Sequence, residues 1–179
     1  MGIYLNPGYE NFEEILSADI YVDKTMMIDE INGFIDKRNK YICLSRPRRF
    51  GKTIAGNMLS SYYSKGCDSH ALFEGLKISS VPDYEEKLNK YNVIKIDFNS
   101  EYQNTEDKDD LIKILSEDIN AEMRETFPDV VFAENDTLAR CILKTYKASG
   151  ETFIIIIDEY DVLVREQVGG ELFERAFQE

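Results

Sequence analysis

One short segment carries the residue types of a phosphate-binding loop. Residues 45–53 read SRPRRFGKT and end in Gly51, Lys52 and Thr53. In a P-loop, a glycine precedes a lysine and then a serine or threonine, between a strand and a helix. The backbone N–H groups and the lysine contact the phosphates, and the hydroxyl ligates Mg²⁺. The segment therefore predicts a site for Mg-ATP.

The loop departs from the strict pattern at its first position, where Arg46 replaces a glycine. An arginine can occupy that position only if the local backbone avoids the conformation that demands glycine. A basic, solvated turn before a helix is the alternative interpretation. We expect the phosphates to be bound by Arg46, Arg48, Arg49, Phe50, Gly51, Lys52 and Thr53.

A second motif supplies the acidic partner of this loop. Four isoleucines at 154–157 lead into Asp158 and Glu159, a pattern typical of a Walker B strand. Asp158 is expected to fix Mg²⁺ together with Thr53, and Glu159 to polarise the attacking water. Lys52 and Glu159 are thus the predicted catalytic residues, and Thr53 and Asp158 the predicted metal ligands. The alternative is a strand end that leads into an acidic loop.

Two further acidic features are interpreted as structural. Residues 82–87 read PDYEEK, which resembles a nuclease signature. That chemistry needs carboxylates from two strands that converge on a metal, whereas these residues form one polar segment, so a turn into a helix is expected. Asp97 is interpreted as a strand-end carboxylate. The sequence contains no NKxD motif, which disfavours a GTPase.

Apolar patterning predicts the elements that must position both motifs. Strands are expected at 40–45, 92–98 and 152–157. Helices are expected at 24–36, 52–64, 107–126, 135–148 and 170–179, the fourth capped by Asn135 or Asp136 and ended by Gly150. The unbroken apolar run at 152–157 indicates a strand buried on both faces. We therefore expect an α/β fold, a three-layer P-loop NTPase sandwich with a mostly parallel sheet.

Composition narrows the classes of partner. The chain has 179 residues and a formal net charge of −13. Residues 1–60 balance in charge, so residues 61–179 carry the acidic excess and are a poor surface for nucleic acid. The sequence has no secretory signal and no apolar run long enough to cross a membrane, which predicts a cytoplasmic protein without a membrane partner. Its three cysteines form no CxxC pair.

Together the motifs resemble the AAA-ATPase-like domain of bacterial and archaeal proteins, which is often joined to a C-terminal PD-(D/E)xK nuclease-like domain. The resemblance spans almost the whole chain, through YVDKT at 21–25, the loop at 45–53, LFEGL at 72–76, residues 93–98 and IDEYD at 157–161. The family itself carries arginine in place of the first glycine. The resemblance implies an ATPase with glutamate beside the Walker B aspartate.

The resemblance also sets expectations for the chain's organisation. Residues 1–39 would be an N-terminal extension with a helix packed on the core, and residues 40–179 an ATPase core truncated after the Walker B region. Any sensor strand or arginine finger would lie beyond Glu179. An empty slot between strands 40–45 and 152–157 would expose strand edges. The two strands could close up, another segment of the chain could fill the slot, or a second copy of the chain could cover it, and the second copy is the favoured outcome.

Two functions follow from these expectations. The first is an ATPase module that hydrolyses or senses ATP to drive or gate an attached effector, such as a downstream nuclease-like domain. The second is a nucleotide-dependent regulatory or interaction switch with little or no hydrolysis.

Overall fold

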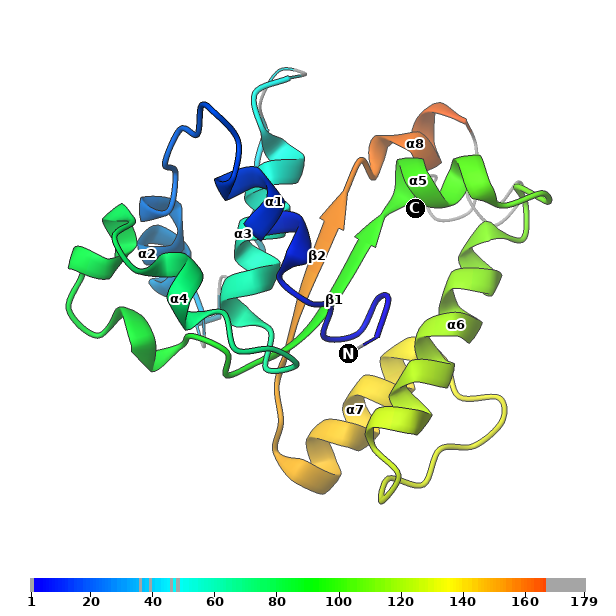
Figure 1. Ribbon diagram of the computed structural model, residues 1–179. Coiled ribbons are helices and arrows are strands. Elements are labelled where there is room, and N and C mark those ends of the chain that lie inside the picture. Colours follow the sequence, from blue (N-terminus) through cyan, green and yellow to red (C-terminus); the bar gives the residue numbers. More distant parts are fainter. Residues whose placement is uncertain (1, 36, 39, 46, 48, 167–179) are drawn as a thin grey trace. The chain divides into compact units, whose positions relative to one another are not determined.

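The computed structural model describes residues 2–35, 37–38, 40–45, 47 and 49–166. The chain forms two compact units, Met1–Val93 and Ile94–Glu179, and the boundary between them falls within a strand. The expected division at residues 39 and 40 stays a prediction. The elements (Figure 1) are α1 Glu10–Leu16, α2 Met26–Asn32, α3 Lys52–Tyr63, α4 His70–Phe73, η1 Lys77–Ser80, η2 Tyr84–Glu86, β1 Asn92–Asp97, α5 Phe98–Asn104, α6 Leu111–Thr126, α7 Leu138–Ser149, β2 Phe153–Asp158 and α8 Asp161–Arg165.

An aromatic core holds the first unit together around α3. The fully buried rings of Phe12 and Phe73 stack with centroids 5.3 Å apart, and Tyr62 meets Phe73 edge-on at 5.4 Å. Such pairs stabilise a core beyond the area that they bury. The predicted helix at 52–64 is confirmed, and Met58 lies on its buried face, but Ile54, expected on that face, is exposed. The aromatic rings therefore fix the helix that begins at Lys52.

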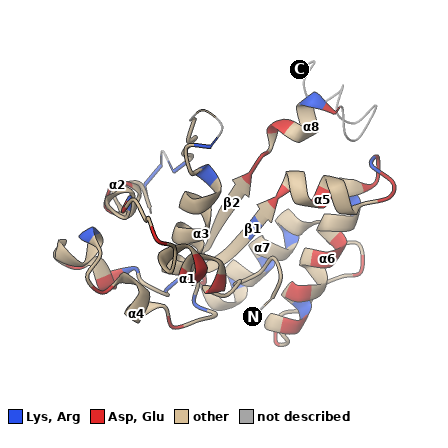
Figure 2. Cartoon of the chain, turned by 45° about the horizontal axis from the view of Figure 1, so that its top comes forward, with Lys and Arg blue, Asp and Glu red and all other residues tan. Residues whose placement is uncertain are grey.

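The second unit contains a parallel sheet of two strands, β1 and β2 (Figure 1). The strands predicted at 92–98 and 152–157 are confirmed to within one residue as β1 and β2. Helix α5 packs against β2, and α6 packs against α7. The α/β class is therefore confirmed. The predicted helix at 107–126 is confirmed as the shorter α6, with Leu115, Ile119 and Met123 buried. Figure 2 shows acidic and basic segments along the length of α6.

Two predictions about strands are wrong. Residues 40–45 form no strand, and Tyr41 is 92% exposed. A strand needs a neighbouring edge, and in the described part of the chain β1 and β2 pair with each other. Strand β2 is not buried on both faces, because Ile155 and Ile157 are 51% and 49% exposed. The exposure is confined to β2, since Val93 and Ile94, on opposite faces of β1, are both fully buried.

The helix boundaries also differ in places. The helix expected at 24–36 is confirmed only as the shorter α2, and the segment at 82–87 contains only the three-residue η2. The helix expected at 170–179 lies outside the described residues. Helices α1, α4, α5 and α8 were not predicted, and each has seven residues or fewer. Within the described residues, no helix has both the length and the apolar character to cross a bilayer.

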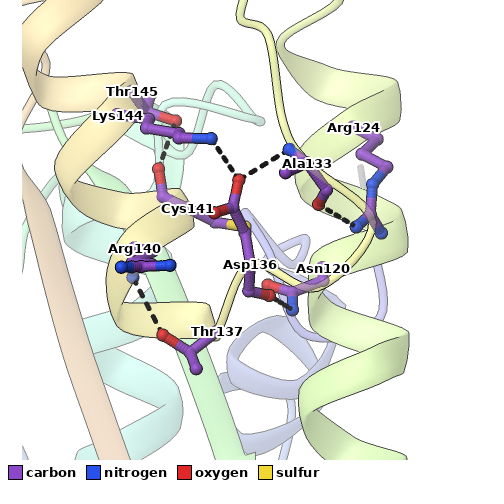
Figure 3. Close-up of polar contacts among 9 residues, drawn as sticks. All are labelled: Asn120, Arg124, Ala133, Asp136, Thr137, Arg140, Cys141, Lys144 and Thr145. Carbon is purple, nitrogen blue, oxygen red and sulfur yellow. Dashed lines mark hydrogen bonds and ion pairs between the residues drawn. The ribbon is translucent and has the colours of Figure 1, made fainter.

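A polar cluster joins α6 to α7 (Figure 3). The carboxylate of buried Asp136 accepts the N–H of Ala133 at 2.6 Å and pairs with the Lys144 ammonium. Asn120 donates to the carbonyl of Asp136 at 3.0 Å. Because Asp136 is turned toward these partners, Thr137 caps α7 instead, so the prediction of Asn135 or Asp136 as the cap is wrong. The predicted end at Gly150 is confirmed, with a left-handed φ of 72°.

We expect Asp136→Asn to lower the melting temperature at pH 7. The hydrogen bonds from Lys144 and Ala133 hold the pKa of Asp136 below its ordinary value. A lowered carboxyl pKa stabilises the fold above the unfolded-state value of about 3.9, and this stabilisation is lost as the pH falls through the folded-state pKa. Thermal melts should therefore show a gap between wild type and variant that narrows below about pH 4. Asp129→Asn, at an exposed carboxylate, is the control, and an equal shift in both variants would contradict the prediction.

Candidate functional site

The backbone of the phosphate loop turns sharply just before α3. Arg49 and Gly51 both have left-handed backbones, with φ of 67° and 78°. Glycine adopts this conformation without penalty, whereas another residue loses about 1–2 kcal/mol. Strain of this kind is concentrated at functional turns. The predicted phosphate ligands Arg46 and Arg48 lie outside the described residues.

The helix that follows begins at the predicted phosphate ligands. Gly51 is the N-cap of α3, where it has no side chain to cap the helix, and Lys52 is the first helical residue. The first intrahelical bond is donated by Ala55 to the Gly51 carbonyl at 3.0 Å, so the amides before it point out of the helix. Such amides and the helix dipole favour negative charge. The exposed side chain of Thr53 lies on the same first turn.

A lysine outside the predicted motif also reaches this loop. The Lys24 ammonium donates to the carbonyl of Phe50 at 2.8 Å, across 26 positions of sequence. The YVDKT segment at 21–25 contributed to the family resemblance, but no periodic pattern could have placed its lysine at the loop.

The acidic pair lies at the end of β2 in the second unit. Asp158 is the last residue of the strand and only 8% exposed. One of its oxygens, Oδ1, accepts the N–H of Glu159 at 3.0 Å, while Oδ2 is buried without a partner in the described residues. A buried unpaired carboxylate oxygen is costly unless it meets a donor or a cation. The orphan oxygen therefore fits the predicted role of Asp158 toward Mg²⁺.

Three charged residues lie near Asp158 in sequence or on the neighbouring strand: Glu159, Lys95 and Asp97. Glu159 is half-buried and has a left-handed φ of 51°, an uncommon conformation for glutamate. Half-buried Lys95 on β1 has a pKa below its ordinary value, because desolvation outweighs the attraction of Asp97 and Asp158. Asp97 itself caps α5 by accepting the N–H groups of Asn99 and Ser100 at 3.0 and 3.1 Å. Its role is therefore the structural one that was expected.

The two halves of the predicted site belong to different units. Residues 49–53 lie in the first, and Asp158 with Glu159 in the second. Among the described residues, no three His, Cys, Asp or Glu side chains are grouped to hold a metal. Mg²⁺ in a phosphate site needs no such cage, since one or two protein oxygens act with phosphates and water. A hydroxyl such as Thr53 and a carboxylate such as Asp158 are of the right chemical type.

An α/β chain with a helix that begins at a GKT sequence, and an acidic pair after a strand, has the features of a nucleotide-binding protein. Residues 6–178 match the family described as "Predicted AAA-ATPase", the AAA-ATPase-like family. The chain belongs to this family, which supports nucleotide binding in general.

One curated relative is an uncharacterized protein encoded in the vnfD 5′ region of Azotobacter chroococcum mcd 1. It is 28% identical over 159 residues, which cover 86% of this chain and 28% of that protein. The chain thus spans little more than a quarter of its relative's length. No solved structure matches the chain.

Proposed function

We propose that this chain is an ATP-binding P-loop module in which residues 46–53 and the pair Asp158–Glu159 act on one Mg-ATP. The observation that carries the proposal is the start of α3, where Gly51 is left-handed, has no side chain of its own to cap the helix, and is followed by Lys52 and Thr53 in the first turn. On this proposal, β1 and β2 are neighbouring strands of a larger parallel sheet of the P-loop type.

Each residue has a defined part in the proposed chemistry. The amides after Gly51 and the ammonium of Lys52 bind the phosphates, with Arg46, Arg48, Arg49 and Phe50 around them. Thr53 and Asp158 hold Mg²⁺, which neutralises phosphate charge when it is bound. Glu159 accepts a hydrogen bond from the water and orients it toward the γ-phosphate.

The module drives or gates an attached effector in the proposed function, and the effector we favour is a nuclease-like domain in the cytoplasm. The length of the curated relative supports an arrangement with additional domains, since this chain matches only 28% of it. The alternative is a switch that binds ATP with little hydrolysis. Steady-state phosphate release, compared with bound-nucleotide affinity, distinguishes the two. Pairing with a second copy of the chain was expected at a slot beside a strand at 40–45. Because residues 40–45 form no strand, that slot gives the pairing no support, and the pairing stays an untested prediction.

We expect Asp158→Asn to lower the affinity for ATP about tenfold in the presence of Mg²⁺ and to leave it unchanged in EDTA. The reason is that the buried Oδ2 would lose its charge toward the metal, and an interaction with a charged group contributes about 1.5–3 kcal/mol. Calorimetric titrations of ATP with and without Mg²⁺ measure both effects.

Asp129→Asn is the matched control, because Asp129 is an exposed carboxylate of the same unit. Circular dichroism verifies that both variants fold. If wild type binds no Mg-ATP, the proposed function is wrong; if Asp158→Asn binds as wild type does in Mg²⁺, the metal role of Asp158 is wrong.

A further inference from the structure

The ammonium of Lys24 contacts the phosphate loop at its most constrained point. Its hydrogen bond of 2.8 Å goes to the carbonyl of Phe50, the residue before the left-handed Gly51. A Cβ atom added to Gly51 would lie 3.1 Å from Lys24 Nζ. Lys24 therefore lies directly against the peptide that joins Phe50 to Gly51.

Both neighbours of Lys24 are anchored, so its backbone is held in place. The Asp23 carboxylate accepts the N–H and hydroxyl of Thr25 at 2.8 and 2.7 Å, and the N–H of Lys77 at 2.7 Å. The hydroxyl of buried Thr25 accepts the N–H of Ile78 at 3.1 Å. These bonds tie the start of α2 to η1. The Lys24 side chain therefore extends to the loop from a backbone segment that hydrogen bonds hold on both sides.

The contact with the Phe50 carbonyl determines where the N–H of the Phe50–Gly51 peptide points. Among the described residues no peptide bond is cis, and in a trans peptide the C=O and N–H groups point in opposite directions. A donor that holds the Phe50 carbonyl therefore turns the Gly51 N–H away from Lys24. A charged donor on the carbonyl also polarises the peptide, which makes its N–H a stronger donor.

We propose that Lys24 is a positioning residue of the phosphate site, which fixes the Phe50–Gly51 peptide so that the Gly51 N–H faces the bound phosphate. This inference rests on the proposed function. Lys24 acts through the loop, outside the GKT motif, and complements Lys52, which contacts the phosphates themselves.

The experiment compares wild type with Lys24→Met, Lys24→Arg and the control Lys90→Met, at an exposed lysine of the same unit. Calorimetry should show about a tenfold loss of Mg-ATP affinity for Lys24→Met, because the Gly51 N–H would no longer be held toward the phosphate and its hydrogen bond to that charged group would be lost. Lys24→Arg should recover part of that loss, and Lys90→Met should bind as wild type does. Without nucleotide, the amide resonance of Gly51 in nitrogen-15 NMR spectra should shift in Lys24→Met and stay in place in Lys90→Met.

The two measurements separate the possible failures. If wild type binds Mg-ATP and Lys24→Met binds equally well, the inference is wrong while the proposed function stands. If no variant binds Mg-ATP but the Gly51 amide shifts in Lys24→Met, the proposed function is wrong and the contact with the loop is real. If no variant, wild type included, binds Mg-ATP and the Gly51 amide does not shift in Lys24→Met, both the proposed function and the inference are overturned. Methionine keeps an unbranched side chain one atom shorter than that of lysine and removes the charge, and circular dichroism verifies folding.

Discussion

Replacing Glu159 with glutamine is expected to lower ATP hydrolysis by about 10²–10⁴-fold, the usual contribution of a positioned base, while ATP affinity stays nearly unchanged. Glu159 directly follows Asp158, whose Oδ1 accepts its N–H, and its backbone is left-handed with φ of 51°. Glutamine keeps the size of the side chain but cannot take a proton. The change should therefore remove the orientation of water and leave the binding of nucleotide intact.

Single-turnover hydrolysis by the protein expressed from its complete gene measures this effect, with calorimetry for the affinity. Glu125→Gln on α6 is the matched control, because Glu125 is an exposed glutamate of the same unit. An unchanged rate in Glu159→Gln would assign the base elsewhere, and Asp161, two residues along, would be tested next. If wild type binds ATP and releases no phosphate, the switch function replaces the ATPase.

Replacing Lys52 with alanine is expected to remove most of the ATP binding. A charge-assisted contact to the phosphates contributes on the order of 1.5–3 kcal/mol, which corresponds to about 10- to 150-fold in affinity. Lys52 is the first residue of α3, directly after the left-handed Gly51, so in the proposed function its ammonium and the first amides of the helix act on the same phosphates.

Calorimetry on wild type, Lys52→Ala and the control Lys90→Ala measures the loss. Equal affinity in wild type and Lys52→Ala would exclude residues 46–53 as the phosphate site. A loss of similar size in Lys90→Ala would instead point to a general effect of removing positive charge from an acidic chain.

The parts of the fold that follow from local patterning could be predicted from the sequence. Alternation in β1, the apolar run of β2 and the stripe of Leu115, Ile119 and Met123 on α6 each identify an element without knowledge of its partners. The start of α3 could be predicted in the same way, since a glycine followed by lysine and threonine is a signal read along the chain.

Features that depend on partners distant in sequence could not be predicted. The apolar residues at 40–45 favour a strand, but a strand also requires an adjacent edge, which a local pattern does not specify. The capping role of Thr137 depends on where Lys144 directs Asp136. The contact of Lys24 with Phe50 and the unpaired oxygen of Asp158 arise from tertiary packing, so the spacing of residues in the sequence does not reveal them.

The contact between Lys24 and the loop also constrains how this sequence can vary. Any side chain at position 51 meets two obstacles, the left-handed φ of 78° and the Lys24 ammonium, 3.1 Å from where a Cβ would lie. Removing the ammonium relieves the second obstacle and leaves the first. Substitutions at positions 24 and 51 are therefore epistatic, because residues in contact do not contribute additively. In a lineage that retains Lys24, glycine at position 51 is held in place by a residue 27 positions earlier in the chain as well as by its own backbone.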